Sequence, residues 1–488
     1  MEKHVQTNLT GRKWIAWIRE RQRWAVQWLT NELEENKPRG TIAVLDGVRA
    51  CAIILVIIYH VNRMTGDRLW DKYTYPFASA LSTFGSSGVI LFFILSGFLL
   101  FIPFAKALLF EGKWPSVRLF YVRRMLRILP GYYLSLFVII LLFQPQYLQP
   151  DHRNQLLLFL TFFMDSSRST FRQLNGPYWT LGIEWWFYML LPFITLGIYA
   201  VVRKVPRSRR LLAVACCLLG LMALGLFVRF WGFYLTEHAA LTFLVPRAVL
   251  NDILFFCFGV TGKYIEVFAL GMLVSLCYIY ASQTMRENRL KLLARRASPW
   301  LFGAGLVLLY FAAMWHFMHD YNYYGWPFIN ALLPYYNEFC DFTYALGFAA
   351  CVAAILFGPL SLQRLFSWTP LRWIGLISYG LYIWHLQLLI VLMNDILPRF
   401  HDLNYYVGYS LYWVWALIVV IPFALLFYVV IEKRWMKLGN DLRRKWEPSR
   451  SPVKGEAQVV ASEQAQKPVP VAVTSKATTR PLQPANRW

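Results

Sequence analysis

The chain has 488 residues, of which 58% are hydrophobic, 18% aromatic and 15% charged, and its formal net charge is +23. A soluble domain carries about 25% charged and roughly 45–50% apolar residues, so this composition excludes a single soluble core, as well as disordered, collagen-like and coiled-coil chains. The seven cysteines include no C-x-x-C pair, which argues against a disulfide framework or a zinc site, and we expect no bound metal. The composition predicts an all-α, polytopic membrane protein.

Ten stretches are apolar enough to cross a bilayer, which takes about 20 mostly apolar helical residues per crossing. In chain order they lie near 45–62, 83–102, 131–146, 183–202, 211–231, 263–282, 300–318, 341–358, 374–393 and 408–431. The apolar segment at 155–164 is too short to cross and predicts an interfacial or re-entrant piece. We expect no cleavable signal peptide, because residues 1–40 contain no apolar core segment.

The basic residues divide unequally between alternate loops. One set of loops holds 18 Lys and Arg, and the intervening set, which is longer, holds 8; the richer set comprises 103–130, 203–210, 283–299 and 359–373. By the positive-inside rule the richer set is cytoplasmic, and both termini are cytoplasmic too because the number of spans is even. Much of the net charge therefore sets the topology, and we expect no nucleic-acid partner.

The two ends differ from the transmembrane domain, which we place at 41–435. Residues 1–40 include a basic, Trp-rich stretch at 12–33 that predicts an amphipathic helix, either flat on the anionic inner leaflet or packed on the protein's own cytoplasmic face. Residues 436–488 are expected to form a cytoplasmic tail. It is mostly disordered, because from about Pro448 it is rich in Pro, Ala, Val, Gln and Lys without any period.

Charged side chains inside apolar spans need a reason, since each costs about 2.5–3.5 kcal/mol on insertion scales. In the first span Arg49 and His60 are 11 residues apart, about three helical turns, so they lie on one helix face. Two explanations stay open. Either the two belong to a functional site, or Asp46 caps the helix and pairs with Arg49 while His60 is hydrogen-bonded inside the bundle.

Three arginines precede the apolar part of the third span. Arg124 and Arg127 stand at i and i+3 on one helix face, and Arg123 adjoins them. Two guanidinium groups in this arrangement suit a phosphate or pyrophosphate, although positive-inside anchoring explains them equally well.

Polar residues also interrupt the fourth and ninth spans. Glu184 stands near Trp179 and other aromatic residues, a combination that suits a sugar-like acceptor. Ser378, Tyr382 and His385 form a polar stripe at i, i+4 and i+7 that must face the protein interior. A structural hydrogen-bond network explains this stripe at least as well as catalysis does.

Five short motifs follow one another along these spans. They are LDG-x-R with a His eleven positions after the Arg, FFILSGFLL with Ser96 and Gly97, R-x-x-R-I-x-P at 124–130, WTLGIEWWFYMLLP at 179–192, and I-S-Y-x-x-Y-x-x-H at 377–385. In this order they resemble the acyltransferase 3 family of integral membrane O-acyltransferases, over about residues 41–431. Thr180 stands where the family usually has Ser, and Trp185 and Trp186 replace polar residues that are commoner there.

The resemblance implies transfer of an acyl group, commonly acetyl, from cytoplasmic acyl-CoA to a hydroxyl of a glycan, a lipid-linked precursor or a small molecule. A bacterial inner (plasma) membrane is the expected location, and acyl-CoA is the donor substrate, with no bound cofactor. The fused extracytoplasmic hydrolase-like domain of the family is not expected, because the 56 residues after Glu432 cannot hold a domain of roughly 100–200 residues.

We expect Arg124 and Arg127, with Arg123, to bind the phosphates of acyl-CoA, and the thioester to pass Arg49 toward His60. His60 then acts as general base, because an imidazole titrates near neutrality, at about pH 6.5, or it carries the acyl group transiently. Glu184 is expected to orient His60 or to grip the acceptor.

The alternative is a transporter of a glycan precursor or an acylated compound, with Arg49, His60 and Glu184 lining its path. The arginine pair favours the enzyme, and the lack of an internal repeat counts against transport. A non-enzymatic membrane scaffold leaves the polar face of the first span unexplained. The acceptor, the acyl chain length and the oligomeric state stay open.

Overall fold

The structure is a computed structural model, and it describes residues 42–67, 69–70, 72–242, 245–284, 289–400 and 403–446, together with 14, 20–21, 23 and 27–33. One compact unit comprises Met1–Gly439, and the second, Asn440–Trp488, is described only as far as Trp446. Most of the predicted N-terminal amphipathic segment and the tail beyond residue 446 therefore lie outside the described residues.

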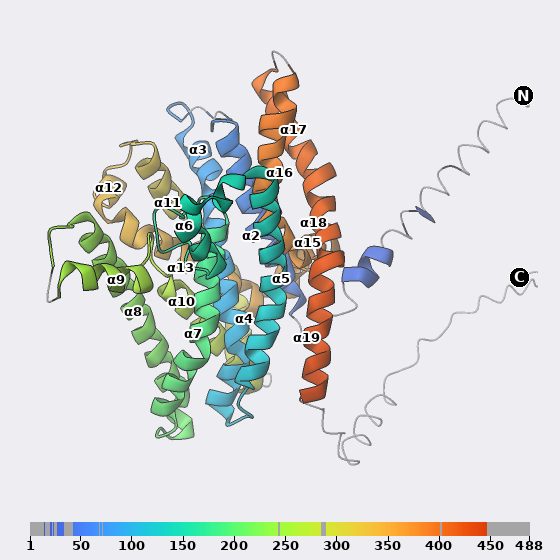
Figure 1. Ribbon diagram of the computed structural model, residues 1–488. Helices are drawn as coiled ribbons and strands as arrows, with labels where there is room; N and C mark the ends of the chain where they lie inside the picture. The colour runs from blue at the N-terminus through green and yellow to red at the C-terminus, as the bar shows by residue number, and fades with distance from the viewer. Residues whose placement is uncertain are drawn as a thin grey trace, which may run out of the picture. The chain divides into compact units, whose positions relative to one another are not determined.

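The described part of the chain is helical and contains no β-strand, which confirms the all-α prediction (Figure 1). It holds ten helical spans long and apolar enough to cross a membrane, the number predicted from the sequence. The protein is therefore an integral membrane protein. The helices of these spans are α2 (Ala43–Met64), α4 (Gly88–Phe110), α5 (Val117–Phe143), α7 (Tyr178–Val202), α8 (Arg210–Glu237), α10 (Ile265–Thr284), α11 (Arg289–Asp320), α13 (Tyr336–Phe357), α16 (Ser378–Val391), and the continuous series α17 (Tyr405–Trp415), α18 (Ile421–Phe427) and α19 (Lys433–Trp446).

Short helices connect the spans. They are α3 (Pro76–Thr83), α6 (Arg153–Leu160), α9 (Arg247–Cys257), α12 (Pro327–Asn330), α14 (Leu360–Phe366) and α15 (Thr369–Leu376). Helix α6 has 8 residues, too few to cross a bilayer, as expected for the apolar segment at 155–164.

Two spans differ from their predicted limits in a way that matters for function. Helix α5 begins at Val117, where the Ser116 hydroxyl accepts a hydrogen bond from the Leu119 N–H, and it continues through Pro130. Arg123, Arg124 and Arg127 therefore lie on a rigid helix rather than in a loop. The ninth span is divided at Ile377, so that Ser378 is the first residue of α16.

Helices α4 and α10 lie against each other inside the bundle because glycines let their backbones approach (Figure 1). A Cβ on Gly97 would lie 2.3 Å from the carbonyl oxygen of Phe268, and a Cβ on Gly271 would lie 2.3 Å from that of Ile94. Close packing of small residues is a main source of helix association in a bilayer, where burial from water gives little. The glycine of the FFILSGFLL motif is thus a packing residue.

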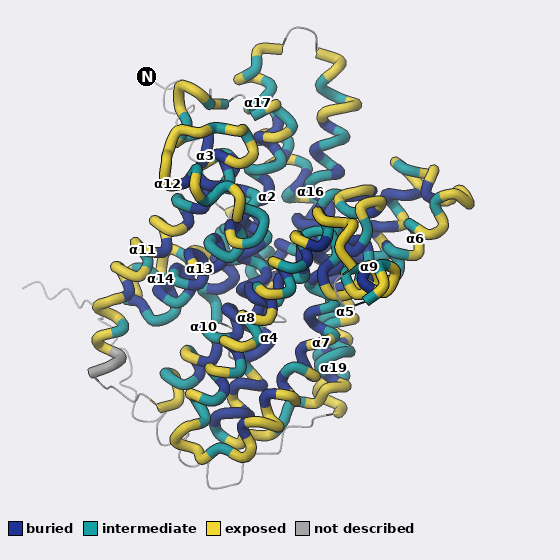
Figure 2. The backbone as a smooth tube through the Cα atoms, turned by 90° about the vertical axis from the view of Figure 1, so that its left-hand side faces the viewer, coloured by how far each residue is buried: buried dark blue, intermediate teal, exposed yellow. Residues whose placement is uncertain are grey.

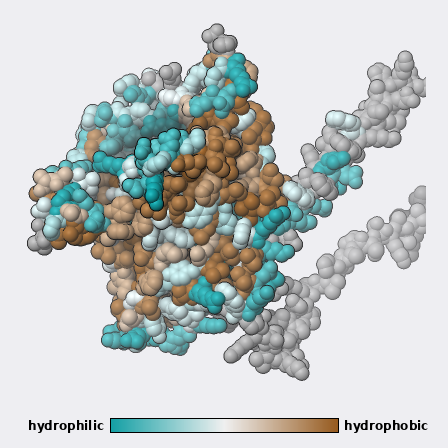
Figure 3. All heavy atoms as spheres, in the orientation of Figure 1, coloured by the Kyte–Doolittle hydropathy of each residue, from teal (hydrophilic) through white to brown (hydrophobic). Residues whose placement is uncertain are grey.

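Buried residues gather where the inner helices meet, whereas the outer helix faces and the loops are exposed (Figure 2). Many of the exposed side chains are large and apolar, among them Phe193, Leu212, Phe227, Val307 and Leu417. On the face shown in Figure 3, hydrophobic side chains cover the sides of the helices and hydrophilic ones gather toward their ends. Apolar helix sides with polar helix ends are typical of a protein whose middle part is surrounded by lipid.

The close contact between α4 and α10 leads to a testable prediction about stability. Gly271→Val should lower the free energy of unfolding in detergent by about 1–3 kcal/mol, because its side chain has no room against α4. Gly303→Val on α11 is the matched control, since nothing lies within 4 Å of its Cβ position. Equal thermal unfolding of the two variants would contradict this account of the contact.

Candidate active site

Two cavities with a shared wall lie among the inner helices. The first has a volume of about 330 Å³ and the second about 280 Å³. Tyr382 of α16 and Val89 of α4 line both of them. The Tyr382 hydroxyl is hydrogen-bonded to the hydroxyl of Thr180 on α7, so that a pair of satisfied polar groups stands at the boundary.

The first cavity is cationic. Four arginines line it, one from α2 and three from α5, against two carboxylates; these six residues are Arg49, Arg123, Arg124, Arg127, Asp46 and Glu184. Arg49 lies 4.0 Å from Asp46, and the buried Nε of Arg124 has no hydrogen-bond partner among the described residues. Such a cavity suits a ligand with several phosphate charges, because guanidinium groups bind phosphate through charge-assisted hydrogen bonds.

Glu184 belongs to this first cavity. The Ser96 hydroxyl donates a hydrogen bond to its carboxylate, and the Ser96 oxygen lies 3.4 Å from the Tyr188 hydroxyl. The motifs of α4 and α7 thus meet at one carboxylate, and Ser378 lines the same cavity. No hydrogen bond joins Glu184 to His60 among the described residues, where His60 contacts the Val56 carbonyl oxygen and His385, so the expected role of Glu184 in orienting His60 stays a prediction.

His60 and Trp179 line the second cavity, and His60 is backed by His385. The Nδ1 atom of His60 lies 2.9 Å from the Val56 carbonyl oxygen and 3.3 Å from Nε2 of His385. The Nδ1 atom of His385 lies 2.8 Å from the Leu381 carbonyl oxygen.

These contacts assign the protons of both neutral rings. A carbonyl oxygen only accepts, so each Nδ1 must carry the hydrogen and donate it. The Nε2 atom of His60 is then unprotonated, and it makes no hydrogen bond to any described residue. A free imidazole lone pair in a cavity is the arrangement that a general base requires.

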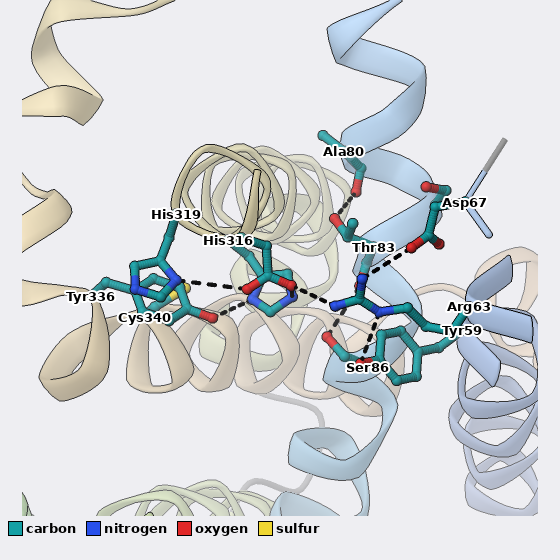
Figure 4. Close-up of polar contacts among 12 residues, drawn as sticks. Tyr59, Arg63, Asp67, Ala80, Thr83, Ser86, His316, His319, Tyr336 and Cys340 are labelled. Carbon is teal, nitrogen blue, oxygen red and sulfur yellow. Dashed lines mark hydrogen bonds and ion pairs between the residues drawn. The ribbon is translucent and has the colours of Figure 1, made fainter. Parts of the chain in front are cut away.

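The C-terminal end of α2 is tied to α11 by an ionic network (Figure 4). Arg63, which also lines the second cavity, lies 3.0 Å from Asp67 and 2.9 Å from Asp320. Asp320 in turn lies 3.5 Å from His316 and 3.6 Å from His319. The two carboxylates neutralise Arg63 and fix its guanidinium at the cavity wall.

A largely buried ionic cluster, which no sequence motif indicated, is formed by Arg229 of α8, Glu266 of α10 and Asp341 of α13. The Arg229 guanidinium lies 3.2 Å from Glu266 and 2.5 Å from Asp341, and it donates to the Asn337 carbonyl oxygen. All three charged residues lie in predicted membrane spans. Because a charge in such a span costs free energy, its presence there was a signal that could have identified the cluster from the sequence. The cluster lines neither cavity and joins three helices.

Comparison with known proteins decides the family. The model of the acyltransferase 3 family, an acyltransferase domain, matches residues 42–429. The chain belongs to the acyltransferase 3 family. The matched segment contains both cavities and the five motifs. Within the described residues, no group of three or more His, Cys, Asp or Glu side chains could hold a metal ion.

Several known bacterial proteins are similar to most of this chain. YrhL of Bacillus subtilis is 27% identical over 376 residues, which cover 71% of this chain and 48% of YrhL. Peptidoglycan O-acetyltransferase OatA of Listeria monocytogenes is 27% identical over 365 residues, 71% of this chain and 49% of OatA. O-acetyltransferase OatA of Staphylococcus aureus is 23% identical over 375 residues, 71% of this chain and 50% of that protein. The chain spans about half the length of these relatives, and no solved structure matches it.

Proposed function

We propose that this protein is a membrane O-acyltransferase that moves an acyl group, acetyl in the first instance, from cytoplasmic acyl-CoA to a hydroxyl of a glycan, a lipid-linked precursor or a small molecule. One observation carries the proposal: a cationic cavity and a cavity with an unprotonated histidine nitrogen meet at Tyr382. The family and the names of its O-acetyltransferase relatives support it. A bacterial inner (plasma) membrane is the proposed location.

The donor occupies the first cavity in this proposal. Arg123, Arg124 and Arg127 bind the phosphates of acyl-CoA, and the thioester reaches the boundary with the second cavity past Arg49. The excess of basic residues in loops such as 103–130 and 203–210 supports a cytoplasmic entrance, with both termini on the same side. In acyl-CoA the phosphates and the thioester lie at opposite ends of a long flexible arm. The phosphates can therefore bind in the first cavity while the thioester lies at the boundary with the second.

Transfer then takes place at His60. Its Nε2 removes the proton from the acceptor hydroxyl, the acceptor oxygen forms a bond to the thioester carbonyl carbon, and the C–S bond breaks. The proton passes from His60 to the departing sulfur, so coenzyme A leaves as the thiol and His60 returns to its neutral form. The carbonyl of Val56 and the ring of His385 hold the imidazole in the tautomer that this step needs.

Donor binding is tested with Arg127→Ala. Loss of one charge-assisted hydrogen bond to a phosphate should cost about 1.5–3 kcal/mol and weaken acetyl-CoA binding roughly 10- to 150-fold, with little loss of folded protein. Arg295→Ala, an exposed arginine on α11, is the control and should bind normally. Unchanged affinity of the Arg127 variant, measured by calorimetry, would leave the α5 arginines with a topological role alone.

The base is tested with His60→Gln. This side chain keeps a hydrogen-bonding group but cannot take up and release a proton near neutrality, so transfer should be abolished while acetyl-CoA binding and thermal stability stay near normal. A structural histidine predicts the reverse pattern, with stability falling by roughly 1–3 kcal/mol and turnover kept in the folded fraction. Near-normal turnover by well-folded protein would remove His60 from the catalytic role.

The boundary is tested with Tyr382→Ala and Tyr382→Phe. Removing the ring joins the cavities and admits water to the thioester, so acetyl-CoA hydrolysis without acceptor should rise in the Ala variant. The Phe variant keeps the ring and should stay close to wild type. A transporter would hydrolyse acetyl-CoA in none of the three proteins, which separates that alternative from the enzyme.

A further inference from the structure

The second cavity contains a positive charge that no acidic side chain neutralises. Two arginines, Arg63 and Arg172, are among its lining residues, which include no Asp or Glu. Arg63 is ion-paired with Asp67 and Asp320 (Figure 4). Arg172 is an exposed residue that makes no ion pair with any described residue, and it lines the same cavity as His60.

Arg172 is positioned by aromatic rings rather than by carboxylates. Its guanidinium carbon lies 5.1 Å from the ring centre of Phe171 and 5.8 Å from that of Trp179. The face of an aromatic ring attracts a cation and orients it, yet it leaves the hydrogen-bond donors of the guanidinium available. Arg172 is thus held in place with its donors free for a ligand.

The loop that carries Arg172 is itself fastened to the bundle. Asn175 donates to the Ile383 carbonyl oxygen at 2.8 Å, and Gln144 donates to the Leu174 carbonyl oxygen at 2.9 Å. Asp165, near the start of the loop, is ion-paired with Lys263. These contacts connect the loop to α16, to the end of α5 and to the residues before α10, so Arg172 keeps a defined place beside the cavity.

We propose that the acyl acceptor carries an oxyanion, a carboxylate or a phosphate, and that Arg172 binds this group while His60 receives the proton of the acceptor hydroxyl. A guanidinium binds either oxyanion through two parallel hydrogen bonds, which fixes orientation as well as position. The inference rests on the proposed function and deepens it, because it restricts the acceptor to an anionic class.

The size of the cavity adds to this inference. Its volume of about 280 Å³ lies near the lower end of the roughly 300–1,000 Å³ of small-molecule pockets, so it fits one sugar unit rather than a length of polymer. The rings of Tyr59, Trp179 and Tyr382 supply apolar surface for the sugar face, and Arg172 supplies the charge. An anionic sugar matches both.

The test measures access to His60 and does not depend on acyl transfer. Full-length protein in a non-ionic detergent is treated with diethyl pyrocarbonate, and modification of His60 is quantified by peptide mass spectrometry. Glucuronate, inorganic phosphate and neutral glucose are added separately at equal concentrations. At least one of the two anions should protect His60 and glucose should not; protection by glucuronate indicates a carboxylate, and protection by phosphate alone indicates a phosphate.

Two variants test whether Arg172 is the group through which anions protect His60. Arg172→Gln should require roughly tenfold or more anion for the same protection, since a charge-assisted hydrogen bond is lost. Arg168→Gln, an exposed arginine of the same loop that does not line the cavity, should behave as wild type. Anions held by the first cavity do not cover His60, so they do not enter the measurement.

The opposite results are equally definite. Protection by glucose equal to that by glucuronate, no protection by either anion, or an equal loss in both arginine variants would overturn the proposal. A His60 that the reagent cannot reach would do so as well, because an acceptor cavity must admit a small molecule. If the His60→Gln protein keeps near-normal turnover and the Arg127→Ala protein binds acetyl-CoA with unchanged affinity while anion protection holds, the proposed function falls and the anion site stands.

Discussion

The ring of Tyr382, whose hydroxyl is hydrogen-bonded to that of Thr180, separates the two halves of the candidate active site. Each hydroxyl satisfies the other in a bundle where an unpaired polar group is costly, so the boundary is stable without water. The arginines lie on one side of it and His60 on the other. This separation lets one membrane bundle hold a polyanionic donor and an unprotonated base without placing four guanidinium groups beside the same imidazole.

Hydropathy and charge predicted the ten spans because both act over long segments. The limits of single helices were harder to predict, since α5 begins at Val117, well before the apolar part of its sequence, and continues past Pro130. Windows of apolar residues mark the part of a helix that contacts lipid, and the arginines stand in the part that does not. The spacing of Arg124 and Arg127 predicted a shared helix face, but the continuity of that helix with the apolar span required the structure.

The candidate site was predictable residue by residue but not in its arrangement. Arg49 and His60 share a helix face, yet Tyr382 comes between their cavities from a helix more than 300 residues later. The motif containing Glu184 suggested a carboxylate partner for His60, whereas the bundle supplies a second imidazole from α16. Arg172 belongs to no periodic pattern and has a positive φ of 58°, a conformation that tertiary contacts impose.

The close approach of α4 and α10 has a consequence for how this protein can change. Ser96, the donor to Glu184, directly precedes Gly97, whose missing side chain sets the spacing of the two backbones. A larger residue on either helix would displace α4 and with it the hydroxyl beside the donor cavity. Sequence change at these glycines is therefore restricted by the position that the Ser96 hydroxyl needs, although the glycines contact no ligand. A larger residue on α10 would require a compensating change on α4.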